Sequence, residues 1–438
     1  MRTDLRQFIR LRQPKFFSRS PLANHLYSAL AAATPPESKS LRPLPEYVPQ
    51  AFWDWATTTA RYLFTPRHEF VTAEKAPSNS HYSVPNTLRV AIAGDWGTGT
   101  EESFAVNNEM LRWDGGQKPH LTIHLGDVYY VGGEKEVEQN CLDGKDKDGK
   151  QNFPTKDSVG WNLGSLGSFA LNGNHEMYAK GNAYFDTFLP KLGMLDDDGK
   201  PQGQVTSFFC LENDFWRILA IDTGYNSANW LASSNLLCQL EDSLIAWLRT
   251  LIPANDTKAT VLLSHHQYFS AFEDNYLLPV KQLSPFFKSP VLWIWGHEHR
   301  SAGYDLFNVD GISLQAHGRC IGHGGMPVEA AEPSADPKHS AAKQKLIYYD
   351  ARPNTFYTGV GETPPIGING FAHFSFVGPR LTIQHKYLVP DSTAPNPPSY
   401  SSAVPLITES FTCSGCQIRW EGFIGPNPQI AGLNINPK

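Results

Sequence analysis

The chain has 438 residues, enough for one large domain with extensions or for two domains. Its net charge of −6 at pH 7 gives no general electrostatic attraction to nucleic acid or anionic lipid, so no nucleic-acid scaffold role is expected. Hydrophobic residues make up 41% and charged residues 18%, with 35 Gly and 33 Pro, which indicates a loop-rich enzyme containing β-structure rather than a helical bundle.

Residues 1–85 are predicted to form an N-terminal extension that is partly irregular. Prolines are frequent between residues 35 and 49, and residues 1–36 carry six Lys or Arg against a single acid, Asp4. This basic start is compatible with an organelle transit peptide or with a solvated basic arm. The sequence contains no secretory signal and no apolar run long enough to span a membrane, so we expect no membrane span and favour an intracellular protein.

Strands and helices alternate through residues 86–389, which we expect to form one domain. An apolar strand at Leu88–Ala93 is followed by a helix at Glu101–Trp113 and a second strand at Leu121–Leu125. The remaining elements are a helix at Ser243–Leu251 and strands at Ser207–Leu211, Trp216–Ile221, Thr260–Ser264, Val291–Trp295 and Ile312–Ala316. The alternation predicts an α/β domain with a largely parallel sheet, in which function lies at the carboxyl ends of the strands.

The end of this domain is predicted from a β-hairpin, because Gly370–Val377 and Leu381–Leu388 alternate polar and apolar residues. Residues 390–438 become rich in Pro and Ser and are predicted to be a tail. The tail holds Cys413 and Cys416 in a CxxC pattern. A zinc ribbon needs a second such pair, so we expect a local disulfide or two free thiols.

Five short segments carry most of the unusual polar chemistry, and each stands where a strand is predicted to end. They are AGDWGTG (residues 93–99), LGDVYY (125–130), LNGNHE (171–176), LLSHH (262–266) and WGHEHR (295–300). Because the carboxyl ends of neighbouring parallel strands share one edge of a sheet, we expect the segments to build one site. Their Asp, Asn and His side chains offer enough donors for two metal ions such as Zn, Fe or Mn.

The ordered segments resemble the motifs of the calcineurin-like metallophosphoesterase superfamily: an Asp block, GDxx(D/Y), GNH(D/E), a His block and GHxH. All five are present in this order between Asp95 and His299, and the resemblance extends over residues 88–388. It implies a four-layer α/β/β/α sandwich of two mixed sheets, with an N-terminal extension and a C-terminal tail. Residues 86–389 would then be the metallophosphoesterase catalytic domain.

One departure from the superfamily pattern narrows the resemblance. The first motif commonly reads Asp-x-His, but this chain has Gly97 where that histidine stands. Tyr130, three residues after Asp127, would replace the lost ligand as a phenolate. Loss and replacement together are similar to the purple acid phosphatases, and closest to their short single-domain members. A phenolate favours Fe(III), a hard ion.

The resemblance implies a role for each metal-binding residue. The first ion, Fe(III), would be held by Asp95, Tyr130 and His299, and the second, Fe, Zn or Mn, by Asn174, His265 and His297. Asp127 would bridge the two ions. Tyr129 competes with Tyr130 and His266 competes with His265, but the family positions favour Tyr130 and His265.

The implied activity is hydrolysis of a small phosphate monoester, of the acid phosphatase type. Asp127 and His175 would be catalytic: a metal-bound hydroxide attacks phosphorus, and His175 assists the leaving group or orients the phosphate. The alternatives are a phosphodiesterase or nucleotide pyrophosphatase on the same site, or a metal-binding scaffold without catalysis.

Four further residues are candidates for contacting the substrate or supporting the ligands: Glu176, His266, Asp222 and His323. Glu176 is expected either to orient His175 or to be exposed. The glycine-rich segment 317–325 has two open interpretations. In the first, its glycines and Arg319 shape a wall of the substrate site and His323 reaches the phosphate. In the second, the segment is only a glycine-rich connection.

Overall fold

A computed structural model describes residues 62, 65–129, 131–155, 158–227, 238–355, 366–391, 399–424 and 433–435. The basic segment 1–36 and Tyr130 lie outside these residues. Among the helices described, none is both long and apolar enough to cross a membrane.

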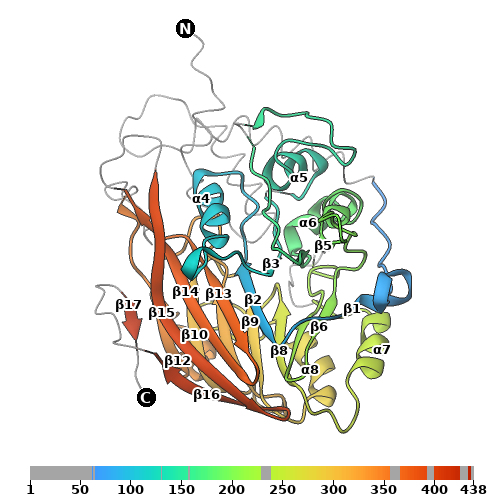
Figure 1. Cartoon of the computed structure of the whole chain (residues 1–438). Helices are drawn as coiled ribbons and strands as arrows, with labels where there is room; N and C mark the ends of the chain where they lie inside the picture. Colours follow the sequence, from blue (N-terminus) through green and yellow to red (C-terminus); the bar gives the residue numbers. More distant parts are fainter. Residues whose placement is uncertain are drawn as a thin grey trace.

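Two mixed β-sheets form the centre of the fold (Figure 1). Within the described residues, one sheet has nine strands, in the order β1 (His81–Ser83), β6 (Phe209–Glu212), β7 (Trp216–Ala220), β8 (Ala259–Ser264), β9 (Val291–Trp295), β11 (Ala316–Ile321), β10 (Ser301–Phe307), β12 (Leu346–Asp350) and β17 (Leu433–Ile435). The other has eight, in the order β16 (Gln417–Phe423), β15 (Tyr400–Ser414), β14 (Arg380–Pro390), β13 (Gly370–Val377), β2 (Thr87–Ala93), β3 (Leu121–His124), β4 (Gly167–Ala170) and β5 (Gly193–Met194).

Three buried clusters show how the layers stack. Ile92 and Phe374 of the eight-stranded sheet pack with Ile294 of the nine-stranded sheet in the cluster between the sheets. Val106 belongs to a second cluster, outside the eight-stranded sheet, and Leu248 to a third, outside the nine-stranded sheet. The α-helices of the described residues include α4 (Glu101–Met110), α5 (Glu134–Cys141), α6 (Asn174–Tyr178), α7 (Asp242–Leu251), α8 (Leu277–Leu283) and α9 (Ser340–Lys343). Helix, sheet, sheet and helix thus follow one another, and the predicted α/β class with two mixed sheets is confirmed.

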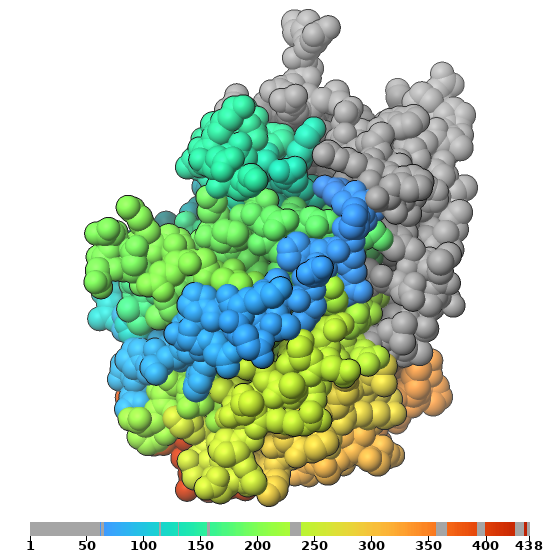
Figure 2. Space-filling model, turned by 90° about the vertical axis from the view of Figure 1, so that its right-hand side faces the viewer, coloured from blue at the N-terminus to red at the C-terminus, as the bar shows by residue number. Residues whose placement is uncertain are grey.

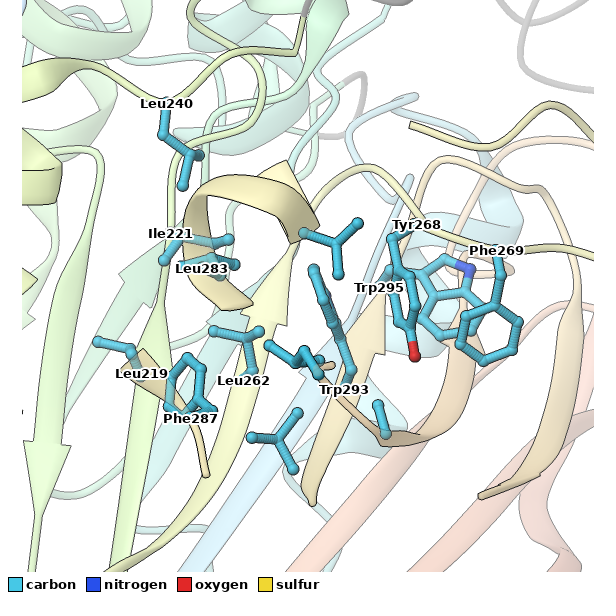
Figure 3. Close-up of a cluster of buried hydrophobic side chains, with 14 of the residues drawn as sticks. Leu219, Ile221, Leu240, Leu262, Tyr268, Phe269, Leu283, Phe287, Trp293 and Trp295 are labelled. Carbon is cyan, nitrogen blue, oxygen red and sulfur yellow. The ribbon is translucent and has the colours of Figure 1, made fainter. Parts of the chain in front are cut away.

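The central strand β9 illustrates why the sequence forms this sandwich. Successive side chains of a strand point to opposite faces, so a strand buried on both faces is apolar throughout. Leu292 and Ile294 enter the cluster between the sheets, whereas Trp293 and Trp295 enter the cluster on the outer face. Figure 3 shows both tryptophans among the apolar side chains on that face, with Leu283 of α8 nearby.

The domain begins before residue 86, because β1 pairs in parallel with β6. Figure 2 shows this early part of the chain, in blue, lying across the surface between the green and yellow-green segments. Part of the predicted N-terminal extension is therefore a strand of the nine-stranded sheet.

The C-terminal part of the chain also differs from the predicted tail. The hairpin at β13 and β14 is present, but it is not the last element, because β15 pairs along β14 and β16 pairs with β15. Leu406 and Phe411 are buried there, so the Pro- and Ser-rich stretch gives way to a regular strand with an apolar face. Cys413 lies on β15 and Cys416 in the turn between β15 and β16, and both are free thiols.

The strand predicted at Ile312–Ala316 is found later in the chain, as β11 at Ala316–Ile321, and this strand includes Arg319. Arg319 is fully buried, and its Nε donates to Glu409 Oε1 of β15 at 2.6 Å, which ties the two sheets together. His385 Nε2 lies 2.9 Å from the same oxygen. Burial would raise the pKa of Glu409, but the charge and hydrogen bonds of Arg319 lower it to about 2. Arg319 is thus committed to this pair, and the interpretation of it as a substrate wall is wrong.

Replacing Glu409 by glutamine is expected to lower the free energy of unfolding by about 3–5 kcal/mol, because it leaves the guanidinium of Arg319 buried without a counter-charge. Chemical denaturation followed by circular dichroism measures the change. Glu421→Gln is the control, since Glu421 lies 3.6 Å from a largely exposed Arg419. That change should cost less than about 1 kcal/mol, and equal costs for both variants would contradict the prediction.

Candidate metal centre

The five polar segments follow five strands whose carboxyl ends meet. β2, β3 and β4 are parallel neighbours in the eight-stranded sheet, and β8 and β9 are parallel neighbours in the nine-stranded sheet. Each strand ends shortly before one of the predicted ligand segments: Asp95, Asp127, Asn174, His265, and the pair His297 and His299. The two sheets therefore present their ligand segments to one another at the same end of the sandwich.

A first group of donors surrounds the hydroxyl of Tyr129. The one proton of this hydroxyl is shared between two acceptors, Asp95 Oδ1 at 2.8 Å and Asp127 Oδ2 at 3.0 Å, and the oxygen lies 3.1 Å from His299 Nε2. His299 Nε2 is 3.5 Å from Asp95 Oδ1. Three of the residues predicted to hold the first metal are thus within reach of one ion. The fourth, Tyr130, lies outside the described residues, so its predicted role stays a prediction.

A second group of donors converges on Nε2 of His265. This nitrogen lies 3.2 Å from Asn174 Oδ1, 3.2 Å from His297 Nδ1 and 3.3 Å from Asp127 Oδ1. All four side chains are at most 5% exposed. These are the residues predicted to hold the second metal, together with the predicted bridge.

The carboxylate of Asp127 lies between the two groups. Its Oδ1 faces His265, while its Oδ2 accepts from Tyr129. The backbone N–H of His175 also donates to Oδ1, at 3.0 Å. One carboxylate with an oxygen toward each donor group is the arrangement that a bridging ligand requires.

The backbone is strained where it delivers these ligands. Asp95, Asp127 and His297 have positive φ angles of 56°, 76° and 61°, which are uncommon for residues other than glycine. Gly126 precedes Asp127 with a φ of 100°, and a Cβ there would lie 2.8 Å from His265 Nδ1. A Cβ on Gly173 would lie 2.1 Å from Asp127 Oδ1. Such strain concentrates at functional sites, and the two glycines allow the segments to approach closely.

The protonation pattern of the second group fits a cation. His265 Nδ1 lies 2.8 Å from the carbonyl oxygen of Leu125, so a neutral His265 carries its proton there. Its Nε2 lone pair then faces Asn174 Oδ1 and Asp127 Oδ1, which are acceptors. Burial would lower the pKa of His265, but the charge of Asp127 raises it to about 9, so without a metal the imidazole itself becomes the cation. A metal ion would satisfy the same lone pairs.

Glu176 supports the loops rather than the imidazole of His175. It is fully buried, and its Oε2 accepts the backbone N–H of Gly173 at 3.0 Å and of Asp127 at 3.2 Å. Burial and the charge of Asp127 raise the pKa of Glu176 to about 8. The side chain therefore joins the second and third polar segments.

The other three candidates differ in position. His266 brings a ring nitrogen within 4.8 Å of donor atoms of His265 and His297, and its Nδ1 lies 3.0 Å from Thr223 Oγ1. Oδ1 of Asp222 accepts the backbone N–H groups of the turn at residues 224 and 225, each at 2.8 Å, and no described contact links it to the ligands. The ring nitrogens of His323 are buried without a hydrogen-bond partner among the described residues, and burial lowers its pKa to about 3.

Residues 88–301 match the family model of the calcineurin-like phosphoesterases. This segment belongs to that family. Every residue predicted to bind metal lies inside the matched phosphoesterase segment. No curated protein matches the chain.

Solved structures similar to this chain include three that differ widely in sequence. Purple acid phosphatase PPD1 from yellow lupin (Lupinus luteus) seeds is 12% identical with a TM-score of 0.41, and the match covers 69% of this chain and 52% of the lupin chain. GAP50, the anchor in the inner membrane complex of Plasmodium, is 13% identical with a TM-score of 0.43, covering 73% and 89%. PhoD is 11% identical with a TM-score of 0.45, covering 79% and 73%. The chain spans about half the length of the lupin protein.

Two tyrosines that contact predicted metal ligands lie outside the sequence motifs and were not predicted. The hydroxyl of Tyr276 lies 3.1 Å from His297 Nε2, and Asn174 Nδ2 donates to the hydroxyl of Tyr178 at 2.9 Å. Tyr178 stands four residues after Asn174 on α6, and that spacing places two side chains on one helix face, so sequence could have indicated it. Tyr276 lies in an irregular segment, where no local pattern signals a contact with His297.

Proposed function

We propose that this chain is a dinuclear metal-dependent hydrolase of phosphate monoesters, of the purple acid phosphatase type. The observation that carries the proposal is the position of Asp127, with one oxygen toward the Tyr129 group and the other toward the His265 group. The family match over residues 88–301 supports a metal-dependent phosphoesterase independently.

The donor atoms divide between two ions in this proposal. Asp95, His299 and a tyrosine phenolate would hold the first ion, Asn174, His265 and His297 the second, and Asp127 both. When bound, such a pair neutralises the oxygens of a phosphoryl group and lowers the pKa of a water molecule toward 7. The phenolate favours Fe(III) at the first position, and the oxygen and nitrogen donors at the second suit Fe, Zn or Mn.

His175 is the residue proposed to protonate the leaving group. Its backbone N–H donates to Asp127, its Nε2 lies 3.7 Å from Asp127 Oδ2, and its ring packs 4.4 Å from the ring of Tyr129. The imidazole is therefore beside the bridging carboxylate without belonging to either donor group. From there it would give a proton to the departing alkoxide, as a general acid does.

The proposal predicts that hydrolysis of p-nitrophenyl phosphate depends on bound metal. Chelation should reduce the rate to background, and adding Fe(III) with Zn, Fe or Mn should restore it, because two cations are needed to neutralise the phosphoryl group. Elemental analysis accompanies each rate measurement, from acid to neutral pH.

A second substrate separates the alternatives. Bis(p-nitrophenyl) phosphate is a diester with one more ester group to accommodate, and the monoester is expected to react faster. A higher rate on the diester would favour the phosphodiesterase or nucleotide pyrophosphatase. Metal-loaded protein that hydrolyses neither ester at any pH would point to a scaffold without catalysis.

A further inference from the structure

Two tyrosines lie just outside the proposed ligands of the second metal. The hydroxyl of Tyr276 is 3.1 Å from His297 Nε2, and the hydroxyl of Tyr178 accepts from Asn174 Nδ2 at 2.9 Å. Tyr276 is 5% exposed and Tyr178 is 6% exposed, so both contacts are shielded from bulk water. In each case the tyrosine engages the side of the ligand that faces away from the other donors.

We propose that Tyr276 and Tyr178 are positioning residues for the second metal site, each fixing the orientation in which its partner presents a lone pair to the ion. The inference rests on the proposed function, because it requires an ion among Asn174, His265 and His297. A histidine that binds a metal through one ring nitrogen generally donates the N–H of its other ring nitrogen to a neighbouring group. For His297 that group would be the phenol of Tyr276.

For His297 the tyrosine contacts Nε2, and the ring then presents Nδ1 to the second metal site. A neutral imidazole carries a proton on one nitrogen and a lone pair on the other. Because a phenol can accept as well as donate, an ion bound to the lone pair of Nδ1 would leave the proton on Nε2, which then donates to the hydroxyl oxygen of Tyr276. Nδ1 is the atom that faces His265 Nε2, at 3.2 Å. Without the phenol, His297 loses the contact that holds the ring in this orientation and accepts the Nε2 proton of the metal-bound form.

For Asn174 the tyrosine contacts the amide nitrogen, at the end of the side chain that faces away from the metal site. A primary amide has an acceptor oxygen and a donor nitrogen of nearly equal size, and rotation by about 180° exchanges them. The hydrogen bond from Nδ2 to Tyr178 turns Oδ1 toward His265 Nε2, 3.2 Å away. Only this orientation gives an oxygen ligand.

The loop that carries Tyr276 is fastened to the last ligand motif. Glu298, between His297 and His299, is fully buried; its Oε2 accepts from Trp295 Nε1 at 2.8 Å, and its Oε1 accepts from the hydroxyl of Ser270. Within the loop, the backbone N–H of Tyr276 donates to the carbonyl of residue 267 at 3.2 Å. The segment with the ligand histidines thus also holds the loop that places the phenol on His297.

The test replaces each phenol by phenylalanine, which keeps the ring and removes the hydroxyl. Tyr276→Phe and Tyr178→Phe are each expected to weaken binding of the second metal by about 10–100-fold, while the first metal stays bound. Titration of metal-free protein with Zn(II) or Mn(II), followed by calorimetry and elemental analysis, measures this without reference to activity. The stoichiometry should fall from two ions toward one at a metal concentration that saturates the wild type.

Tyr268→Phe is the matched control, because Tyr268 is buried in the same loop and its hydroxyl donates to the carbonyl of Phe307 instead. It should bind two ions like the wild type. Equal weakening in Tyr268→Phe, or a melting temperature of metal-free Tyr276→Phe and Tyr178→Phe well below that of the control, would overturn the inference in favour of simple packing. So would wild-type affinity in both variants. A wild type that binds no second ion would instead overturn the proposed function.

Discussion

Replacing Asp127 with asparagine is expected to leave a folded protein that no longer holds two metal ions and no longer hydrolyses phosphate esters. Asparagine has nearly the same size and tolerates the positive φ of 76° at this position. It lacks the negative charge and offers one acceptor oxygen, whereas Asp127 turns one oxygen to each donor group. Loss of the ions would raise the pKa of the attacking water far above neutrality. We therefore expect kcat to fall by roughly 10³-fold or more.

Asp222→Asn is the control for this variant. Asp222 and Asp127 are similarly buried, at 2% and 1% exposed, and each follows a strand. They differ in that Oδ1 of Asp222 accepts two backbone N–H groups of its own turn. Its replacement should keep two ions and most of the activity. Elemental analysis, the rate on p-nitrophenyl phosphate and the melting temperature are compared for both variants. An Asp127→Asn protein with two ions and a wild-type rate would contradict the bridging role.

The sequence was informative about the centre of the fold because local signals and global structure agree there. Strands such as β8 and β9 are apolar on both faces, since each is buried between layers, and their ends are marked by polar ligand segments. Parallel neighbours necessarily bring their carboxyl ends together, so the convergence of Asp95 and Asp127 could be inferred before any coordinates. The order of the strands in the two sheets could not.

Other features depend on contacts between distant parts of the chain. The charged Arg319 made the sequence of β11 look unlike that of a buried strand. Its burial is explained only by its partner Glu409, 90 residues later in the chain. The strand β15 follows a Pro-rich stretch, and the composition of that stretch led to the prediction of a tail instead of a strand. Tyr276 reaches His297 through the path of a loop, which no periodicity records. In each case the information lies in pairing rather than in local composition.

The iron-loaded protein is expected to be purple or pink, and to lose this colour when Tyr129 and Tyr130 are both replaced by phenylalanine. The colour would be the charge-transfer band of a phenolate bound to Fe(III). Burial and the charges of Asp127 and Asp95 raise the pKa of Tyr129 well above its usual value, so without a metal this phenol stays neutral. A trivalent ion among the same carboxylates reverses the local field and favours the phenolate.

The two single variants then assign the ligand. Motif spacing predicts Tyr130, whereas the structure places the hydroxyl of Tyr129 within 3.1 Å of donor atoms from Asp95, Asp127 and His299. Phenylalanine at 129 keeps the ring that packs on His175, so loss of the band there would report the oxygen rather than the packing. Iron content measured with each visible spectrum separates a lost phenolate from a lost ion. A double variant that keeps the band, or a colourless wild type with two ions other than iron, would remove the purple acid phosphatase assignment and leave the phosphoesterase family in place.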